Sequence, residues 1–63
     1  MGPFTRELRR RLREAGFVFE REAKGDHEIW SHPDGRRVTI DIGTRSRHTA
    51  NKILKDAGLP KAF

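Results

Sequence analysis

The first apolar stretch of the chain has the spacing of an amphipathic helix. Apolar residues recur every three or four positions, at Phe4, Leu8, Leu12 and Ala15, and this spacing gathers them on one helix face. Thr5 is the expected N-cap, because its hydroxyl can accept from a free N–H group of the first turn. Gly16 is expected to end the helix in a left-handed conformation, with Phe17 folding back onto the last turn.

Three segments in the middle of the chain predict strands joined by short turns. Residues 17–22 and 27–31 are rich in residues that favour strands. Residues 37–42 alternate between polar and apolar, which predicts a half-buried strand with Val38, Ile40 and Ile42 facing the core. Residues 24–26 and 32–35 contain the Gly, Asp and Pro that are typical of turns.

A second amphipathic helix is predicted near the C-terminus. Its apolar stripe consists of Ala50, Ile53, Leu54 and Ala57. Ser46 or Thr44 is the expected N-cap, and Gly58 and Pro60 are expected to end the helix. The element order is therefore α-β-β-β-α, in one domain that spans residues 1–63.

This order predicts an α+β fold with a three-stranded antiparallel sheet. Three consecutive strands linked by short turns form such a sheet, and one of its faces must be covered. Two amphipathic helices are available, so we expect them to lie side by side on that face. The double-stranded-RNA-binding domain has this architecture, although a fold alone does not establish a function.

The charge distribution favours an anionic partner. Fourteen Lys and Arg against nine Asp and Glu give a net charge of +5. Residues 1–14 carry five Arg and two Glu (+3), residues 15–35 two bases and five acids (−3), and residues 36–55 six bases and one acid (+5). Nucleic acid is the commonest partner of a small basic domain. The run Arg9-Arg10-Arg11 is equally consistent with a solvated helix face.

Composition excludes several classes of protein. Cys is absent, which removes disulfides, thiolate nucleophiles and Cys-based zinc sites. No apolar run approaches the ~20 residues that a membrane span needs, and the N-terminus lacks the apolar stretch of a secretory signal. We therefore expect a cytoplasmic protein without a cofactor.

The three histidines differ in their settings. With no Cys, and no pair of His at one-turn helical spacing, a metal site is not expected. His32 precedes Pro33 in a turn and is interpreted as a polar turn residue. His48 lies in the first turn of the second helix, where it is either a surface residue or a contact for phosphate.

His27 is the best candidate for chemistry. It follows a glycine turn and opens a strand, so a ligand has room to approach it. Asp26 and Glu28 flank it, and a nearby carboxylate stabilises a charged imidazole. A histidine that titrates near neutrality can act as general acid or base in RNA cleavage, where the 2′-hydroxyl of RNA is the nucleophile. The local context alone favours the alternative, a strand histidine without a reactive role.

Aromatic residues also have two interpretations. Phe4, Phe17 and Phe19 are most simply core residues. Trp30 lies on the strand face opposite Ile29, so it either covers the sheet or stacks on a base from the open face.

The order and spacing of several motifs resemble the HicA family of toxin ribonucleases. The resemblance runs from about Thr5 to Leu59 and rests on Leu8, Leu12, residues 15–17 (AGF), 25–30 (GDHEIW), 32–36 (HPDGR), 38–39 (VT), 46–51 (SRHTAN) and 53–59 (ILKDAGL). In the family, the catalytic histidine lies in a Gly-Ser-His motif, and the matching residue here is His27. Asp26 replaces the usual Ser, Glu28 replaces a frequent second His, and Asp41-Ile42-Gly43 stands where many members have a segment with Pro and His.

The resemblance implies a double-stranded-RNA-binding-like fold and metal-independent cleavage of mRNA. It also implies a HicB-type antitoxin that covers the active site. On this hypothesis His27 is catalytic and Asp26 or Glu28 tunes its imidazole. The residues expected to hold the RNA are Lys24, Arg45, Arg47, His48 and Lys52. The alternatives are a non-catalytic RNA-binding module on the same fold and a protein-interaction module with a basic docking surface.

Overall fold

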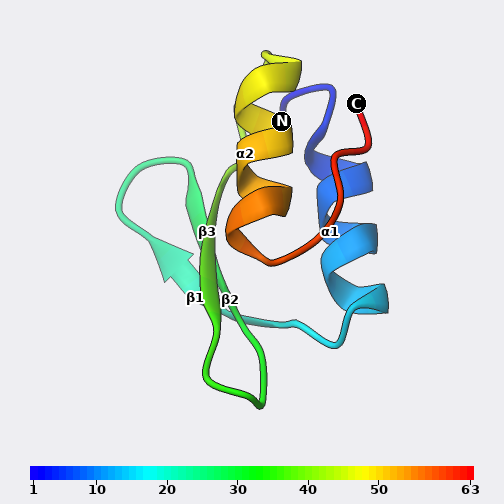
Figure 1. Cartoon of the computed structure of the whole chain (residues 1–63). Coiled ribbons are helices and arrows are strands. Elements are labelled where there is room, and N and C mark those ends of the chain that lie inside the picture. The colour runs from blue at the N-terminus through cyan, green and yellow to red at the C-terminus, as the bar shows by residue number, and fades with distance from the viewer.

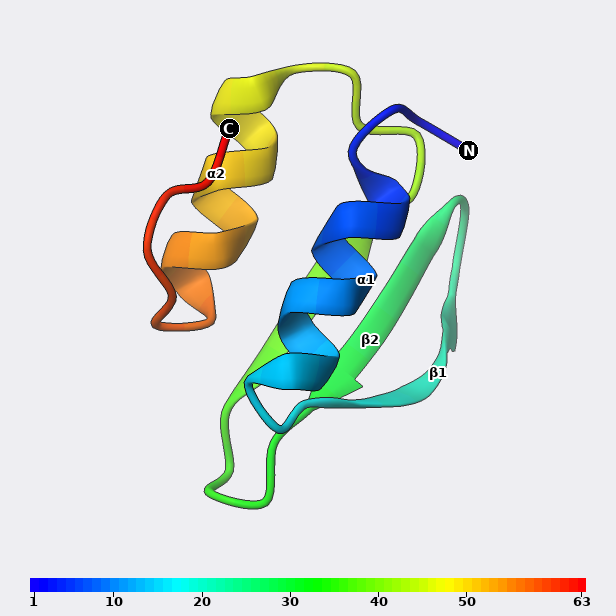
Figure 2. The same cartoon turned by 90° about the vertical axis from the view of Figure 1, so that its right-hand side faces the viewer.

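The computed structural model describes all residues, 1–63, and confirms the predicted element order. The helices and strands are α1 (Thr5–Glu14), β1 (Val18–Ala23), β2 (His27–Ser31), β3 (Arg37–Asp41) and α2 (Arg47–Asp56). The three strands form one antiparallel sheet in the order β1-β2-β3. Figures 1 and 2 show both helices on the same face of this sheet, as predicted.

A single hydrophobic core lies between the helices and the sheet. Its ten buried residues come from α1, the segment after it, β2, β3, and α2 with its C-cap: Leu8, Leu12, Phe17, Trp30, Val38, Ile40, Ala50, Ile53, Leu54 and Ala57. The apolar stripe predicted for the second helix is entirely buried. Phe4, Ala15 and Ile42 are partly buried and pack against this core. Helix packing thus leaves the other face of the sheet open.

Both helices end in the same glycine motif. After α1, the Gly16 amide donates to Arg13 and the Phe17 amide donates to Leu12, at 3.0 and 2.9 Å. Gly16 has a φ of +96°, which a residue without Cβ adopts at least cost. The predicted ends at Gly16 and Gly58 are confirmed, because the amides after α2 repeat the pattern from Gly58 to Lys55 and from Leu59 to Leu54.

The expected caps at the N-termini are confirmed for one helix and wrong for the other. Ser46 caps α2, and its hydroxyl accepts from the amide of His48 at 3.2 Å. Thr5 does not cap α1; Phe4 occupies the N-cap position and makes no side-chain capping bond. The Thr5 hydroxyl is buried and donates instead to the carbonyl of Ile42 at 2.6 Å. Thr5 therefore ties the start of α1 to the end of β3.

On β2, Trp30 rather than Ile29 faces the helices. Trp30 is 1% exposed and pairs with the buried Val38, so it faces the helices. Its indole is consequently unavailable for stacking on a base. The guanidinium of Arg13 lies 5.1 Å from the centre of the Trp30 ring. Phe19 shares this face and makes a T-shaped contact with Trp30, but it is 48% exposed, so its assignment to the core is wrong.

Candidate functional site

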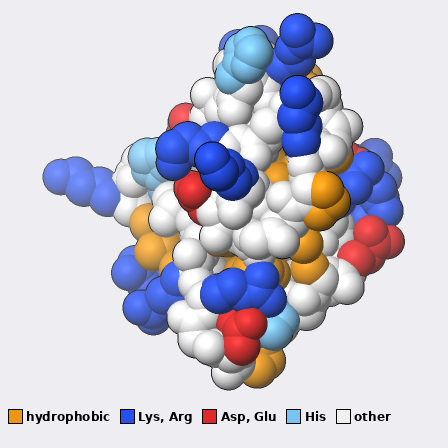
Figure 3. All heavy atoms as spheres, viewed as in Figure 1, with side chains coloured by type: hydrophobic (Ala, Val, Ile, Leu, Met, Phe, Trp, Pro, Cys, Tyr) orange, Lys and Arg blue, Asp and Glu red, His pale blue; other side chains and the backbone are white.

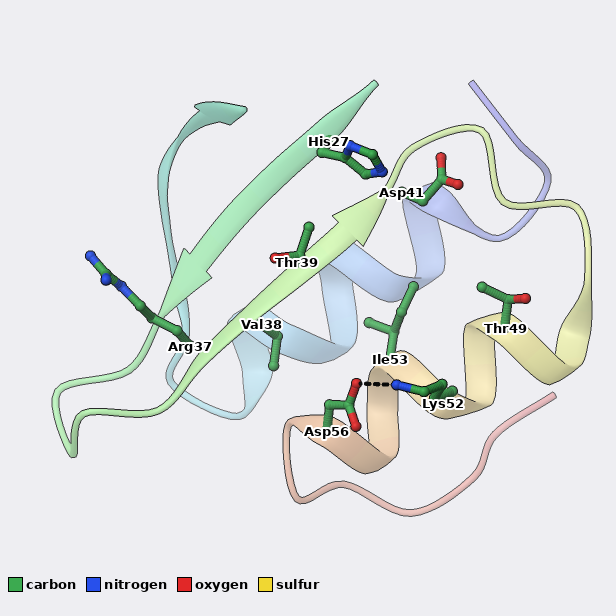
Figure 4. A pocket seen from close by; sticks show the side chains of 9 residues that line it. All are labelled: His27, Arg37, Val38, Thr39, Asp41, Thr49, Lys52, Ile53 and Asp56. Carbon is green, nitrogen blue, oxygen red and sulfur yellow. Dashed lines mark hydrogen bonds and ion pairs between the residues drawn. The ribbon is translucent and has the colours of Figure 1, made fainter. Parts of the chain in front are cut away.

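An open pocket of about 400 Å³ lies along the free edge of β3, between this strand and α2. Its nine lining residues come from β2, β3 and α2: His27, Arg37, Val38, Thr39, Asp41, Thr49, Lys52, Ile53 and Asp56. Figure 4 shows His27 and Asp41 together at one end, with the α2 residues along the other side. The fold thus brings His27 and Lys52, two residues singled out from the sequence, into one pocket.

The imidazole of His27 is exposed and held by one nitrogen. Nδ1 lies 3.0 Å from the backbone carbonyl oxygen of Lys24. A carbonyl oxygen can only accept, so Nδ1 carries the hydrogen in this contact. In the neutral ring Nε2 then has the free lone pair, and in the charged ring it has a proton to give. The turn therefore fixes the tautomer and leaves Nε2 for an external partner.

Asp41 lies directly across the sheet from His27. The two residues are partners in the β2–β3 register, and the Ile42 amide donates to the Asp26 carbonyl at 2.8 Å. That bond flanks the pair, which makes it a non-hydrogen-bonded pair with close side chains. The Asp41 carboxylate also accepts from the Gly43 amide at 2.9 Å through Oδ1. The site thus combines an imidazole with an anchored carboxylate.

Two basic side chains border the pocket, and each has an acidic partner. Lys52 Nζ lies 3.0 Å from Asp56 Oδ2, within α2. Arg37 Nη2 lies 2.8 Å from Glu20 Oε2, across the open face of the sheet. Both basic residues are mostly exposed, and ion pairs in this setting contribute little to stability. Lys52 and Arg37 can therefore exchange these partners for a phosphate at small cost.

A second open pocket, of about 590 Å³, lies beside α2. It is lined by His48, Asn51, Lys52, Lys55, Leu59 and Lys61. Lys52 borders both pockets and so connects them into one surface, which we call the basic helix surface (His48, Lys52, Lys55 and Lys61). Figure 3 shows Lys and Arg side chains spread over the face of the molecule that carries α2.

The remaining predicted RNA-binding residues surround this region without lining either pocket. Arg45 precedes α2 and Arg47 begins it, and both are exposed. Lys24 contributes its backbone carbonyl to His27, while its side chain is exposed. Their part in RNA binding stays a prediction.

The expected tuning of His27 by Glu28 is corrected by the sheet geometry. Adjacent strand residues point to opposite faces, and Glu28 lies on the helix face with 8% exposure. Its carboxylate accepts from Arg9 at 3.0 and 2.6 Å and from Trp30 Nε1 at 3.1 Å. The hydrogen bonds from Arg9 lower the pKa of Glu28, against the opposing effect of burial, and Trp30 adds to the lowering. Glu28 is thus a structural anchor beneath β2.

Asp26 and His32 lie in the turns at the two ends of β2, and the tuning of His27 by Asp26 stays a prediction. Asp26 is exposed in the turn, and its backbone carbonyl accepts from Ile42. His32 Nε2 lies 3.1 Å from the Ala15 carbonyl, and its Nδ1 accepts from the Asp34 amide at 3.1 Å. His32 therefore joins the β2–β3 turn to the end of α1, as a structural turn residue. The chain has no group of three or more His, Asp or Glu placed to hold a metal ion.

Asp41 is the pocket residue that sequence reasoning considered only as a departure from a family pattern. The signal that finds it is the register of the β2–β3 hairpin. Ser31 pairs with Arg37 next to the turn, and counting four residues away from the turn along each strand places His27 opposite Asp41. Thr49 and Asp56 join the pocket only through the packing of α2, which no local pattern specifies.

Fold and site together define a small basic α+β domain with a tautomerically fixed histidine in an open, lysine- and arginine-bordered pocket. Neither helix is long and apolar enough to cross a membrane. Residues 5–59 of the 63-residue chain match the model of the family described as the HicA toxin of bacterial toxin-antitoxin. The chain therefore belongs to the HicA toxin family, whose members act as toxins paired with an antitoxin. A search of curated proteins finds no match.

Proposed function

We propose that this toxin is an endoribonuclease that cleaves mRNA without a metal ion, with His27 as general acid or base. The observation that carries the proposal is the hydrogen bond between His27 Nδ1 and the Lys24 carbonyl. It leaves Nε2 exposed in a pocket that Lys52 and Arg37 border. The reaction needs a proton carrier at one fixed atom, and Nε2 meets that requirement.

RNA supplies the remaining chemistry. The 2′-oxygen attacks phosphorus, the bond from phosphorus to the 5′-oxygen breaks, and a 2′,3′-cyclic phosphate and a 5′-hydroxyl are formed. His27 either takes the proton from the 2′-hydroxyl or gives one to the 5′-oxygen. Lys52 offsets the negative charge that develops on the phosphorane.

The basic helix surface supports binding of the RNA backbone. His48, Lys52, Lys55 and Lys61 surround one open pocket, and Arg45 and Arg47 extend the positive charge toward the start of α2. Contacts of this kind hold phosphates without reading sequence. With mRNA as its substrate the toxin acts in the cytoplasm, and a HicB-type antitoxin neutralises it by covering the pocket of His27.

A non-catalytic RNA-binding module is the second candidate. The observation that favours it is the charge of the pocket, where Asp41 and Asp56 balance Arg37 and Lys52. A pocket without net positive charge attracts phosphate less strongly than the basic helix surface does. On this reading RNA binds along α2 and is not cut.

Cleavage by the His27→Ala variant separates the two candidates. The proposal predicts that the purified variant binds RNA like wild type and loses cleavage by roughly 100- to 10,000-fold, the usual contribution of general acid–base catalysis. Free imidazole added to the variant should restore part of the rate, because it replaces the missing group. If wild type and His27→Ala both bind RNA and neither cuts it, the non-catalytic module is correct. Equal cleavage by both proteins would refute the role of His27.

A further inference from the structure

We propose that Asp41 is a second catalytic residue, the general base that takes the proton from the 2′-hydroxyl, while His27 is the general acid. This inference rests on the proposed ribonuclease function and assigns the roles within it. Attack by the 2′-oxygen and departure of the 5′-oxygen each involve a proton. Because the attacking and leaving oxygens lie on opposite sides of phosphorus, two separate groups serve the reaction better than one.

The register of the hairpin places the two groups side by side. His27 and Asp41 form a non-hydrogen-bonded pair on the open face of the sheet, as the bond from Ile42 to Asp26 shows. Side chains in such a pair have Cβ atoms about 4.5–5.5 Å apart. Figure 4 shows the imidazole and the carboxylate next to each other at the same end of the pocket. A single phosphate can therefore reach both.

Asp41 is held in place by bonds that leave one carboxylate oxygen free. Oδ1 accepts from the Gly43 amide at 2.9 Å, and the backbone carbonyl accepts from the Thr44 hydroxyl at 2.6 Å. Oδ2 has no hydrogen-bond partner in the protein, and the residue is half-buried. The carboxylate is thus fixed by its own loop and presents a free acceptor to the pocket.

The chemistry of the two groups assigns their roles. An ionised carboxylate can only accept a proton, whereas a charged imidazole can give one. In the proposed step the 2′-oxygen transfers its proton to Asp41 as it bonds to phosphorus. The bond from phosphorus to the 5′-oxygen breaks, and this oxygen takes the proton from His27 Nε2. Both groups are open to water. After the reaction, water takes the proton from Asp41 and gives one to His27, which restores both groups.

Charged groups of both signs surround the pair, and Lys52 is the one that the proposal brings to the phosphate. Arg37 on β3 and Lys52 and Asp56 on α2 line the same pocket. Lys24 and Asp26 lie in the turn that precedes His27. Lys52 can turn from Asp56 to a phosphate, and this places a positive charge beside the phosphorane while Asp41 holds the proton.

A substrate with an altered leaving group distinguishes base from acid. We would compare an RNA with a normal linkage and one in which sulfur replaces the bridging 5′-oxygen, because a thiolate leaves without protonation. His27→Ala is expected to be slow on the normal RNA and close to wild type on the sulfur substrate. Asp41→Asn is expected to lose roughly 100- to 10,000-fold on both substrates. Asparagine retains an oxygen that can accept from Gly43, which preserves the loop.

Glu22→Gln is the matched control. The substitution removes one negative charge from the exposed end of β1. Glu22 makes no hydrogen bond or ion pair and lies outside the pocket. The variant should cleave both substrates like wild type. Wild-type rates for Asp41→Asn, or its rescue by the sulfur substrate, would overturn the assignment of Asp41 as base while leaving His27 in place. Failure of wild type to cut either RNA would overturn the ribonuclease proposal itself, and this inference with it.

Discussion

Replacing Glu28 with alanine tests the structural anchor beneath the strand that carries His27. Glu28 is the only buried carboxylate of the protein, with 8% exposure. It accepts two hydrogen bonds from Arg9 and one from Trp30. The substitution removes all three bonds at once. It leaves the Trp30 N–H buried without a partner and the Arg9 charge without its carboxylate.

The expected loss of stability follows from these contacts. A buried donor without a partner costs about 1–3 kcal/mol, and a hydrogen bond to a charged group contributes about 1.5–3 kcal/mol. The side chain of Arg9 is 26% exposed, so water recovers part of its solvation. We therefore expect Glu28→Ala to lower the free energy of unfolding by about 2–3 kcal/mol. In a domain of this size that corresponds to a fall in Tm of roughly 10–20 °C.

Urea unfolding followed by Trp30 fluorescence measures this loss directly, because the chain has one Trp. Glu28→Gln is the matched variant: its amide oxygen can still accept from Trp30, so it should lose clearly less than Glu28→Ala. Glu22 lies directly opposite Glu28 in the β1–β2 register, so Glu22→Gln removes a like-charge neighbour and should not lower stability. A loss below about 0.5 kcal/mol for Glu28→Ala, the range of ordinary surface substitutions, would refute the anchoring role of the carboxylate.

Three further predictions concern pH, backbone conformation and salt. The Arg9 hydrogen bonds lower the folded-state pKa of Glu28 below 4.5, so the unfolded chain takes up this proton first as the pH falls. The stability that Glu28 contributes is complete at neutral pH and is lost as the pH falls below about 4.5. Urea titrations across this range should show a steeper loss of stability for wild type than for Glu28→Gln. Parallel curves would contradict the lowered pKa of Glu28. Gly16→Ala combines a φ of +96° with a Cβ that would lie 2.8 Å from His32 Nε2, whereas Gly35→Ala has a φ of +98° and open space. Thermal unfolding should show a loss of about 1–2 kcal/mol for Gly35→Ala and a larger one for Gly16→Ala; equal losses would exclude the contact with His32. Lys52→Ala should weaken RNA binding and reduce the slope of log K against log salt by about one, and an unchanged slope would remove Lys52 from the RNA interface.

The helices and turns could be predicted because their determinants are local. Gly16 and Gly58 end the helices through bonds to residues within the preceding turn, and Ser46 caps α2 through the amide two residues on. Thr5 has the same chemistry as Ser46, but its hydroxyl donates to the carbonyl of Ile42, which is 37 residues away in the sequence and which folding brings to it at the end of β3. A hydroxyl that could cap its own helix thus bonds instead to a carbonyl of another element.

The facing of β2 could not be predicted because it depends on a partner from another element. Alternation alone allows either Ile29 or Trp30 to face the helices. The larger indole is buried, and this forces Glu28 inward as well. A carboxylate in that position is tolerated only because Arg9 of α1 reaches it, and nothing near Glu28 in the sequence reveals this contact.

The candidate site could be predicted only in part, because its residues come from different elements. His27 was a candidate from its glycine turn, and Lys52 was expected to hold RNA on the hypothesis of a HicA-like ribonuclease. That they share a pocket depends on the packing of α2 against β3, and that Asp41 joins them depends on the hairpin register. Local patterns therefore singled out individual residues, while strand pairing and the packing of α2 brought them together.

The end groups of RNA cut by the wild-type protein in the presence of a metal chelator test the central claim most directly. The account predicts cleavage that persists in the chelator and yields a 2′,3′-cyclic phosphate and a 5′-hydroxyl, with neither product formed by His27→Ala. Cleavage that stops in the chelator, or that leaves a 5′-phosphate, would contradict it, because the 2′-hydroxyl would then not be the nucleophile that His27 serves.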